Sequence, residues 1–222
     1  MLVTGPTGSG KSTTLYSVLS ELDTEEINVA TIEDPVEGQI VGINQTQVNE
    51  RAGLTFANAL RSILRQDPDV LMVGEIRDSE TALIVSQAAL TGHLVYSTLH
   101  TNDSISAVTR LTNLGVEPYL VAATIRGVLA QRLVRKICSH CKTEWEGDQS
   151  IVDRIGEGNY MMGVGCTRCR NTGYAGRIGL FELFIPTNEM LDAIGQGEPL
   201  QTLRKLLDTT DQAYIKIGRA HV

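Results

Sequence analysis

A glycine-rich stretch near the start of the chain constrains its fold more than any other feature. Residues 5–12 read GPTGSGKS, with the apolar pair Leu2-Val3 before them and the run TTLYSVL after them. Three glycines let the backbone curl so that successive N–H groups point inward at an anion, and a helix that starts there adds its N-terminal dipole. The stretch therefore predicts a phosphate-binding loop between a strand and a helix. A flexible glycine turn is the alternative, but it does not explain why the whole motif matches in register.

Individual positions of this loop have predicted roles. Lys11 reaches the β and γ phosphates of a nucleotide, and the Ser12 hydroxyl ligates Mg²⁺. The loop does not encode which purine is bound. We expect the nucleotide to contact a run of consecutive residues: Gly5, Pro6, Thr7, Gly8, Ser9, Gly10, Lys11, Ser12 and Thr13.

Composition and charge limit the classes of protein to which this loop can belong. With 222 residues, of which 42% are hydrophobic, the chain can bury a core in one α/β domain plus a smaller appendage. The net charge of −7 argues against a protein that mainly binds nucleic acid, because phosphate backbones attract clustered Lys and Arg. No apolar run approaches the roughly 20 residues of a membrane helix, and no signal segment opens the chain. We therefore expect a cytoplasmic protein with no direct membrane insertion.

Apolar spacing after the loop predicts helices that alternate with strands. Residues 38–50 alternate only loosely and contain two glycines, which indicates a hairpin or an extended excursion. The remaining pattern predicts strands over 27–32, 70–73 and 94–98, and helices over 11–22, after a cap at Thr55, and over 80–90, 104–114 and 118–133.

Three carboxylates, Glu33, Asp34 and Glu37, follow the predicted strand over 27–32. Ligands of open α/β sheets sit at the carboxyl ends of the strands, so these side chains should lie beside the phosphate loop. One of them can orient and activate a water molecule for hydrolysis. Glu33 is nearest to the strand end and is the predicted water activator. The alternative is that all three are solvated turn residues.

The next apolar run, 70–73, is typical of a buried parallel strand and ends at Gly74-Glu75. A carboxylate that leaves such a strand beside a phosphate loop usually holds Mg²⁺, often through water. Glycine occupies the position where aspartate is usual, so we expect Glu75 to take the magnesium role together with Ser12. A charged residue that merely ends a strand is the alternative.

Two histidines bracket the strand predicted over 94–98: His93 precedes it and His100 follows it. A polar group just past a strand end can sense the γ phosphate, which favours His100 over His93. Single histidines are more often structural than functional, so residue type alone leaves both readings open.

The four cysteines form two CxxC pairs, Cys138/Cys141 and Cys166/Cys169, with 24 residues between the pairs. Paired thiolates on tight turns supply the tetrahedral sulfur geometry that zinc accepts, and a cytoplasmic setting disfavours two permanent disulfides. Four protein ligands close the coordination shell, so the predicted zinc is structural. Reduced free cysteines and an iron site are the alternatives.

Both ends of the chain depart from this pattern. Only Met1–Thr4 precede the loop, whereas strands usually run about five or six residues, so we expect a truncated first strand in a fragment of a longer protein. Residues 217–222 have no helical or strand period, and we expect a non-native tail; an ordinary disordered terminus is the alternative.

Several stretches together point to one family. In chain order they are 5–12, 31–37 (TIEDPVE), 64–69 (LRQDPD), 73–78 (VGEIRD), 91–93 (TGH) and 100–103 (HTND). They resemble the phosphate loop, aspartate box, atypical Walker B and histidine box of the secretion ATPases that drive type II secretion and type IV pilus assembly. The motifs QRLVR before the first CxxC, and GY and GRIG after the second, extend the resemblance to about residue 185.

This resemblance implies a RecA-like catalytic domain from a homohexameric ring that hydrolyses ATP with Mg²⁺. It implies an inner-membrane platform protein and an accessory membrane-anchoring protein as partners, at the cytoplasmic face of the inner membrane. It also implies that Glu33 activates water, that Glu75 serves Mg²⁺, and that His93 and His100 sense phosphate or contact a neighbouring subunit. In the family, further arginines come from an N-terminal domain and the ring interface, so we expect the fragment alone to be a weak ATPase.

The expected organisation is a RecA-like P-loop NTPase core with a parallel-rich sheet over 1–137, followed by three segments. These are a tetracysteine zinc-binding insertion over 138–175, a C-terminal strand and helices over 176–216, and the tail. Two other classes share some of these features. A RecA-like DNA motor should show a basic or aromatic strand-binding loop, and none is identifiable. A non-catalytic adaptor stabilised by zinc would share the cysteines, but it would not need the carboxylates at the strand ends.

Overall fold

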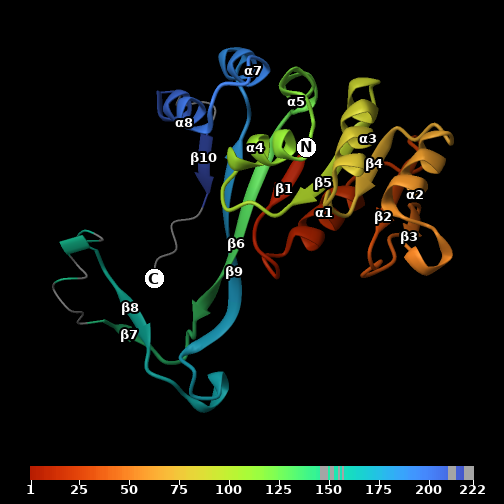
Figure 1. Cartoon of the computed structure of the whole chain (residues 1–222). Helices are drawn as coiled ribbons and strands as arrows, with labels where there is room; N and C mark the ends of the chain where they lie inside the picture. The colour runs from red at the N-terminus through yellow and green to blue at the C-terminus, as the bar shows by residue number, and fades with distance from the viewer. Residues whose placement is uncertain (146–149, 151–152, 155, 157, 210–213, 218–222) are drawn as a thin grey trace. The chain divides into compact units, whose positions relative to one another are not determined.

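The computed structural model describes residues 1–145, 150, 153–154, 156, 158–209 and 214–217 (Figure 1). The chain forms two compact units: unit 1 combines Met1–Gln131 with Phe181–Ile215, and the main part of unit 2 is Arg132–Leu180. Strands β6 (Val128–Ile137) and β9 (Tyr174–Phe184) have residues in both units. The segment boundaries expected at 137 and 175 follow the cysteine motifs, whereas the compact units divide within these two strands.

A parallel-rich sheet is the framework of unit 1. Strand β1 pairs in parallel with β5 and β6, β4 pairs in parallel with β5 and β2, and β3 pairs in parallel with β2. The carboxyl ends of these strands therefore lie at one edge of the sheet. The strand order is β10 (Tyr214–Ile217), β9, β6, β1 (Leu2–Thr4), β5 (Leu94–Leu99), β4 (Val70–Val73), β2 (Val29–Glu33) and β3 (Asn44–Gln47).

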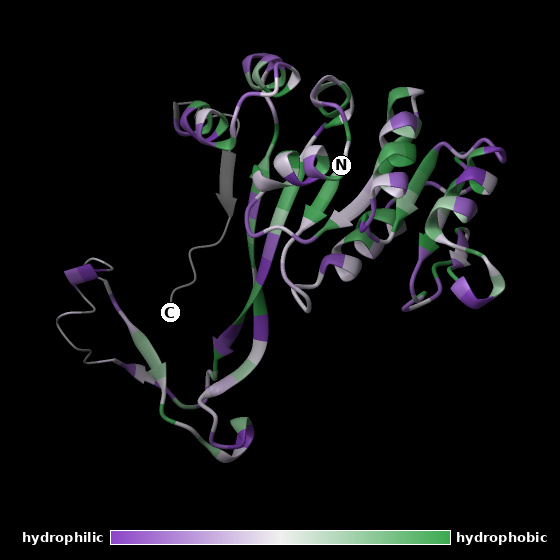
Figure 2. Ribbon diagram, viewed as in Figure 1, coloured by the Kyte–Doolittle hydropathy of each residue, from purple (hydrophilic) through white to green (hydrophobic). Residues whose placement is uncertain are grey.

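Helices cover both faces of this sheet, so a central strand such as β4 (VLMV) is buried and apolar along its length. Neighbouring strand residues enter opposite cores: Leu71 belongs to one buried cluster, and Val70 and Met72 belong to the other. Figure 2 shows the hydrophobic residues concentrated in these strands. Helix α1 (Lys11–Ser20) covers the smaller core. The larger core is covered by α2 (Phe56–Leu64), α3 (Ser79–Leu90), α4 (Ser106–Asn113), α5 (Pro118–Thr124), α7 (Asn188–Gly195) and α8 (Leu200–Thr209).

Short polar residues start several of these helices. The predicted cap at Thr55 is confirmed, because its hydroxyl accepts the Asn58 N–H at 3.2 Å. Asp78 caps α3 in the same way through the Thr81 N–H at 2.8 Å. A single turn of 3₁₀ helix, Glu50–Ala52, is capped by the Asn49 side chain.

The sequence prediction for residues 118–133 was wrong. Residues 118–133 do not form one helix: α5 ends at Thr124, and β6 begins at Val128, where it pairs with Leu2 of β1. A pairing partner about 125 residues away in the chain gives no local periodic signal. For residues 38–50 the sequence left a hairpin or an extended excursion open, and the structure agrees with the second: β3 runs parallel to β2, so the two strands do not form a hairpin.

Unit 2 is small, and its backbone is held by a short strand pair and by a close approach of two glycines. Strands β7 (Lys142–Glu144) and β8 (Met161–Gly163) form an antiparallel pair. A Cβ on Gly163 would lie 2.0 Å from the Gly173 carbonyl oxygen, so only glycine fits between these backbones. The ring of Trp145 meets that of Tyr160 edge-to-face with centroids 6.0 Å apart. One turn of 3₁₀ helix, Thr167–Cys169, carries the last cysteine.

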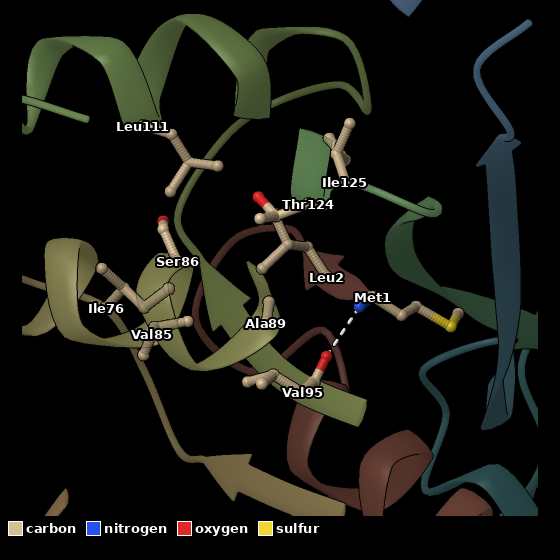
Figure 3. Close-up of a pocket in the computed structure, with 10 residues that line it drawn as sticks. All are labelled: Met1, Leu2, Ile76, Val85, Ser86, Ala89, Val95, Leu111, Thr124 and Ile125. Atoms are coloured by element: carbon tan, nitrogen blue, oxygen red, sulfur yellow. Dashed lines mark hydrogen bonds between the residues drawn. The ribbon is translucent and has the colours of Figure 1, made fainter. Parts of the chain in front are cut away.

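A cavity of about 40 Å³ lies inside unit 1 among α3, α4, β1 and β5 (Figure 3). Its lining is mostly apolar, and the Met1 amino group beside it donates to the Val95 carbonyl oxygen at 2.7 Å. Burial, with a contribution from the Arg126 charge, lowers the pKa of this amino group to about 6. The cavity lies at the amino end of β1, opposite to the phosphate loop, and it is too small for a nucleotide.

The expected non-native tail, 217–222, lies outside the described residues except for Ile217, which ends β10. Across the ranges that the structure describes, none of the helices has both the length and the apolar character needed to cross a membrane.

Candidate functional site

The phosphate loop joins the carboxyl end of β1 directly to α1. Gly5, Gly8 and Gly10 have φ angles of 145°, 76° and 88°, a region that side-chain-bearing residues rarely adopt. A Cβ on Gly5 would also lie 2.2 Å from the Gln131 carbonyl oxygen. The motif therefore has glycine at Gly5 for space as well as for conformation, and its curvature brings backbone N–H groups together at the helix N-terminus.

The Lys11 side chain lies across this loop. Its ammonium group donates to the carbonyl oxygens of Gly5 and Pro6 at 3.0 and 3.2 Å. Burial lowers the pKa of Lys11, and the Glu75 charge partly opposes that shift. The loop and its lysine thus present positive charge and N–H donors at one place, which is the arrangement that binds nucleotide phosphates.

Glu33 ends β2 and is buried, with 4% of its surface exposed. Thr31 and Gln45 donate to its Oε1 at 2.5 and 3.1 Å, and the Tyr16 hydroxyl of α1 donates to its Oε2. Burial and the neighbouring carboxylate raise the pKa of Tyr16, so this hydroxyl remains a donor at neutral pH. These neutral donors hold the carboxylate in one orientation on the α1 side of the sheet.

Glu75 follows β4 and lies in a cluster of charges. Arg77 donates to its Oε1 at 2.5 Å, and His100 Nε2 lies 3.5 Å from its Oε2. The Arg77 hydrogen bond, opposed by burial, holds the pKa of Glu75 below its usual value, so this carboxylate is ionised at neutral pH. Arg77 also lies 3.7 Å from Asp34. The sheet therefore brings Glu75 and His100 together, as expected for residues past neighbouring strand ends.

Gly74 explains why this strand end carries no aspartate. A Cβ at Gly74 would lie 3.2 Å from the Ile32 carbonyl oxygen and 3.4 Å from Glu33 Cα. Larger side chains at Gly74 would press on the end of β2, where Glu33 is fixed. Glycine thus allows the strands that carry Glu33 and Glu75 to approach each other closely.

Glu37 is the carboxylate nearest to the predicted magnesium ligand of the loop. The Ser12 hydroxyl donates to its Oε1 at 3.2 Å. Both oxygens of Glu75 have partners in Arg77 and His100, and Ser12 and Glu37 are partners of each other. The hydroxyl and carboxylate oxygens of the Ser12–Glu37 pair are ligands of the kind that Mg²⁺ prefers. The hydroxyl and carboxylate oxygens beside the loop therefore fit a magnesium ion next to Ser12.

His93 lies elsewhere. It precedes β5, so it is at the amino end of the strand whose carboxyl end leads to His100. Its Nδ1 is 2.9 Å from the Ala88 carbonyl oxygen and 3.2 Å from the Thr91 hydroxyl, both around the end of α3. The phosphate-sensing role does not fit this position within one chain, because β5 separates His93 from the loop. A contact to a neighbouring subunit stays a prediction.

The four cysteines come together in unit 2. Their sulfur atoms all lie within 4.8 Å of one another, and three pairs are 3.8 to 3.9 Å apart. A tetrahedral site with zinc–sulfur bonds of about 2.3 Å places its sulfurs about 3.8 Å apart. Cys138 and Cys169 are buried, and the other two are partly buried. The cluster therefore has the size, shape and ligand type of a structural metal site.

Backbone N–H groups tune these thiols. Burial works to raise the pKa of Cys169, but the N–H groups of Cys166 and Gly173, which point at its sulfur from 3.2 and 3.3 Å, lower it to about 6. Burial raises the pKa of Cys141 to about 12.

Sequence reasoning missed the residues that position the predicted site. Tyr16, Thr31 and Gln45 fix Glu33, and Arg77 fixes Glu75. Tyr16 and Thr31 were assigned only to a helix and a strand, although Thr31 shares a strand face with Glu33 at a spacing of two residues. The long-range partners carry no signal in a single sequence.

Comparison with known proteins places these features in one family. The whole chain, residues 1–222, matches the family model described as type II/IV secretion system protein. The chain is 55% identical over 205 residues to the type II secretion system protein HxcR of Pseudomonas aeruginosa, covering 92% of this chain and 41% of that protein. It is 53% identical over 212 residues to the type IV pilus assembly ATPase PilB of Thermus thermophilus, covering 92% of this chain and 24% of that protein.

A solved structure supports the same assignment. The pilus retraction motor PilT with bound ADP superposes with a TM-score of 0.70 at 32% identity, covering 97% of this chain and 58% of that one. The predicted α/β fold of the P-loop motor ATPases is therefore confirmed. The chain spans less than half the length of these two curated relatives. It belongs to the type II/IV secretion system protein family.

Proposed function

We propose that this chain is the ATP-hydrolysing part of a motor that powers type II secretion or type IV pilus assembly. The observation that carries the proposal is the placement of the phosphate loop, Glu33, Glu75 and His100 at the carboxyl ends of neighbouring parallel strands. Family membership and the relatives named as a pilus assembly ATPase and an ADP-bound retraction motor support it.

Each residue has a role in this proposal. The loop N–H groups and Lys11 hold the β and γ phosphates, and Glu33 orients the attacking water. Ser12 and Glu75 serve the magnesium site, where Mg²⁺ neutralises charge on the phosphate oxygens when it is bound. His100, paired with Glu75, reports whether the γ phosphate is present. The loop and the residue after it, Thr13, form the nucleotide contacts.

The working assembly is a homohexamer at the cytoplasmic face of the inner membrane. Hydrolysis moves an inner-membrane platform protein, and an accessory protein anchors the ring to the membrane. The transition state of phosphoryl transfer needs positive charge beyond Lys11 and Mg²⁺. Arg77 is paired with Glu75 and Asp34, and in this proposal the further charge comes from a neighbouring subunit or another domain. His93 faces such a neighbour.

Phosphate release from ATP by the oligomeric protein tests the proposal against a nucleic-acid motor. The proposal requires turnover that depends on Mg²⁺ and that single-stranded DNA does not raise. DNA-stimulated turnover would favour the nucleic-acid motor instead. Nucleotide binding without any turnover in the assembled protein would favour a non-catalytic adaptor.

Replacing Glu75 by glutamine should raise the Mg²⁺ concentration needed for half-maximal nucleotide binding by about tenfold. The amide keeps the size of the side chain but loses one charge–charge interaction with the metal shell, worth about 1.5–3 kcal/mol. Titrating Mg²⁺ at fixed ATP with a fluorescent nucleotide measures this midpoint.

Glu80→Gln is the matched control, because Glu80 is also paired with an arginine, Arg61 at 2.7 Å, but on the outer face of α3. It should leave the magnesium midpoint unchanged. An unchanged midpoint in Glu75→Gln as well would remove Glu75 from the magnesium site.

The cysteine cluster holds a structural zinc in this proposal. Protein made under reducing conditions should carry about one zinc per chain, and Cys166→Ser should lower both zinc content and the melting temperature of unit 2. Elemental analysis and calorimetry measure the two effects.

Ser139→Ala is the control for zinc, since Ser139 lies between the first two cysteines and is exposed. It should keep full zinc content. Wild-type protein without bound metal would contradict the site, and iron in place of zinc would correct the identity of the metal.

A further inference from the structure

Gln131 anchors the phosphate loop from the neighbouring strand. It lies on β6, with 4% of its surface exposed, and its amide bridges two parts of the loop region. Gln131 Nε2 donates to the Ser9 carbonyl oxygen at 2.8 Å, and its Oε1 accepts the Thr14 hydroxyl at 2.7 Å. The residue is 122 and 117 positions away from these partners in the sequence.

Sheet register places Gln131 at this point. Thr4, the last residue of β1, pairs with Ala130, so the next residue of β6 lies beside Gly5, where the loop begins. The Gln131 carbonyl oxygen fills the space where a Gly5 side chain would be, 2.2 Å from an ideal Cβ. Backbone and side chain of Gln131 therefore contact both the start and the end of the loop.

The amide has only one favourable orientation. A flipped amide would place its oxygen against the Ser9 carbonyl oxygen, and two acceptors repel each other. Ser9 is itself 3% exposed, and in the described part of the chain its hydroxyl has no hydrogen-bond partner. The Ser9 hydroxyl therefore does not help to hold this residue in place. The side-chain hydrogen bond that does so is the one from Gln131 Nε2 to the Ser9 carbonyl oxygen.

We infer that Gln131 is a positioning residue that sets the curvature of the phosphate loop and thereby its affinity for a nucleoside di- or triphosphate. The inference rests on the proposed nucleotide binding. Ser9 and Thr14 flank Gly10–Ser12, whose N–H groups face the phosphates, and Gln131 bonds to both flanks from behind. Lys11 has to leave the Gly5 and Pro6 carbonyl oxygens to reach a phosphate, whereas the bonds of Gln131 need not change.

Gln131→Met should weaken ADP and ATP binding by about 10- to 100-fold, because it leaves a buried carbonyl and a hydroxyl without partners. Thr14→Val should weaken binding by a smaller factor, since the Ser9 bond remains. The double variant should lose less than the product of the two single factors, because both remove the same Thr14–Gln131 bond. At saturating ATP, the turnover number should stay within about threefold of wild type.

Amide hydrogen exchange gives a readout that general destabilisation does not reproduce. Exchange at residues 7–12 should become faster in Gln131→Met without nucleotide, while exchange in α3 stays unchanged. Thr112→Val is the matched control for Thr14→Val, since its hydroxyl bonds only to the Thr109 carbonyl oxygen of its own helix, at 2.9 Å. Gln201→Met on the exposed side of α8 is the control for Gln131→Met.

The outcomes separate this inference from the proposed function. Wild-type protein that binds no nucleotide would overturn nucleotide binding itself. Wild-type binding together with unchanged affinity in Gln131→Met and Thr14→Val would overturn the positioning role alone. If Gln131→Met unfolds, the test rests on Thr14→Val, through its nucleotide affinity and the amide hydrogen exchange of its loop. An affinity equal to that of Thr112→Val would contradict the inference.

Discussion

Lys11→Ala is expected to weaken ATP and ADP binding by at least about 100-fold. Lys11 supplies the side-chain cation of the loop, and charge-assisted hydrogen bonds of this kind contribute about 1.5–3 kcal/mol each. A lysine that bridges two phosphates makes at least two of them, and each 1.4 kcal/mol is a tenfold change in affinity. Equilibrium titration with a fluorescent nucleotide measures the effect. The fold should be largely kept, because the hydrogen bonds that the structure shows for Lys11 go to two loop carbonyl oxygens, those of Gly5 and of the exposed Pro6, and not to the core.

Lys205→Ala is the matched control, since Lys205 is an exposed lysine on α8 away from the loop. Its affinity should equal that of the wild type. If Lys11→Ala bound nucleotide as tightly as the control, the glycine-rich stretch would be an ordinary turn and the site would have to lie elsewhere.

Glu33→Gln is expected to reduce ATP turnover by about 10² to 10⁴ while nucleotide affinity stays within a few-fold of wild type. A positioned carboxylate that accepts a proton from water contributes rate acceleration of this size. The substitution removes the negative charge, and its amide nitrogen would face one of the donors that now hold the carboxylate: Tyr16, Thr31 or Gln45. Turnover and nucleotide affinity are measured on the same oligomeric preparation.

Tyr16→Phe distinguishes the effect of the Glu33 charge from the effect of the hydrogen bonds that orient it. It removes one donor to Glu33 but keeps the charge, so turnover should fall by much less than in Glu33→Gln. Asp34→Asn and Glu37→Gln should also be milder, although Glu37 touches Ser12 and should affect the magnesium dependence. Normal turnover in Glu33→Gln would move the water-activating role to another carboxylate of this turn.

Local sequence signals were sufficient for the parts of the site that lie on one short stretch. The phosphate loop needs glycines at fixed spacings because its φ angles and the closeness of the Gln131 backbone exclude side chains. The two CxxC pairs also predicted one cluster, since four sulfurs at tight turns are a complete set of metal ligands. The strand over 70–73 was found because a strand buried on both faces is continuously apolar.

The sequence did not show which elements meet across the sheet. β6 was assigned to a helix because its spacing of apolar residues after Pro118 also fits a helical face, and its pairing with β1 depends on residues at the other end of the chain. Gln131 was noted only as part of a motif, although it bridges Ser9 and Thr14. For His93, by contrast, the sequence already gave a sign: it precedes the strand over 94–98, and the structure places it at the amino end of β5, away from the loop.

ATP turnover by the oligomeric wild-type protein, measured as phosphate release beside Lys11→Ala and Glu33→Gln, tests the central claim most directly. The account predicts Mg²⁺-dependent turnover in the wild type. It predicts nucleotide binding at least about 100-fold weaker in Lys11→Ala, with turnover lost at ATP concentrations that saturate the wild type, and near-normal binding with turnover reduced by about 10² to 10⁴ in Glu33→Gln. Turnover in Lys11→Ala equal to that of the wild type would contradict the assignment of this loop and its neighbouring strand ends as the site of ATP hydrolysis.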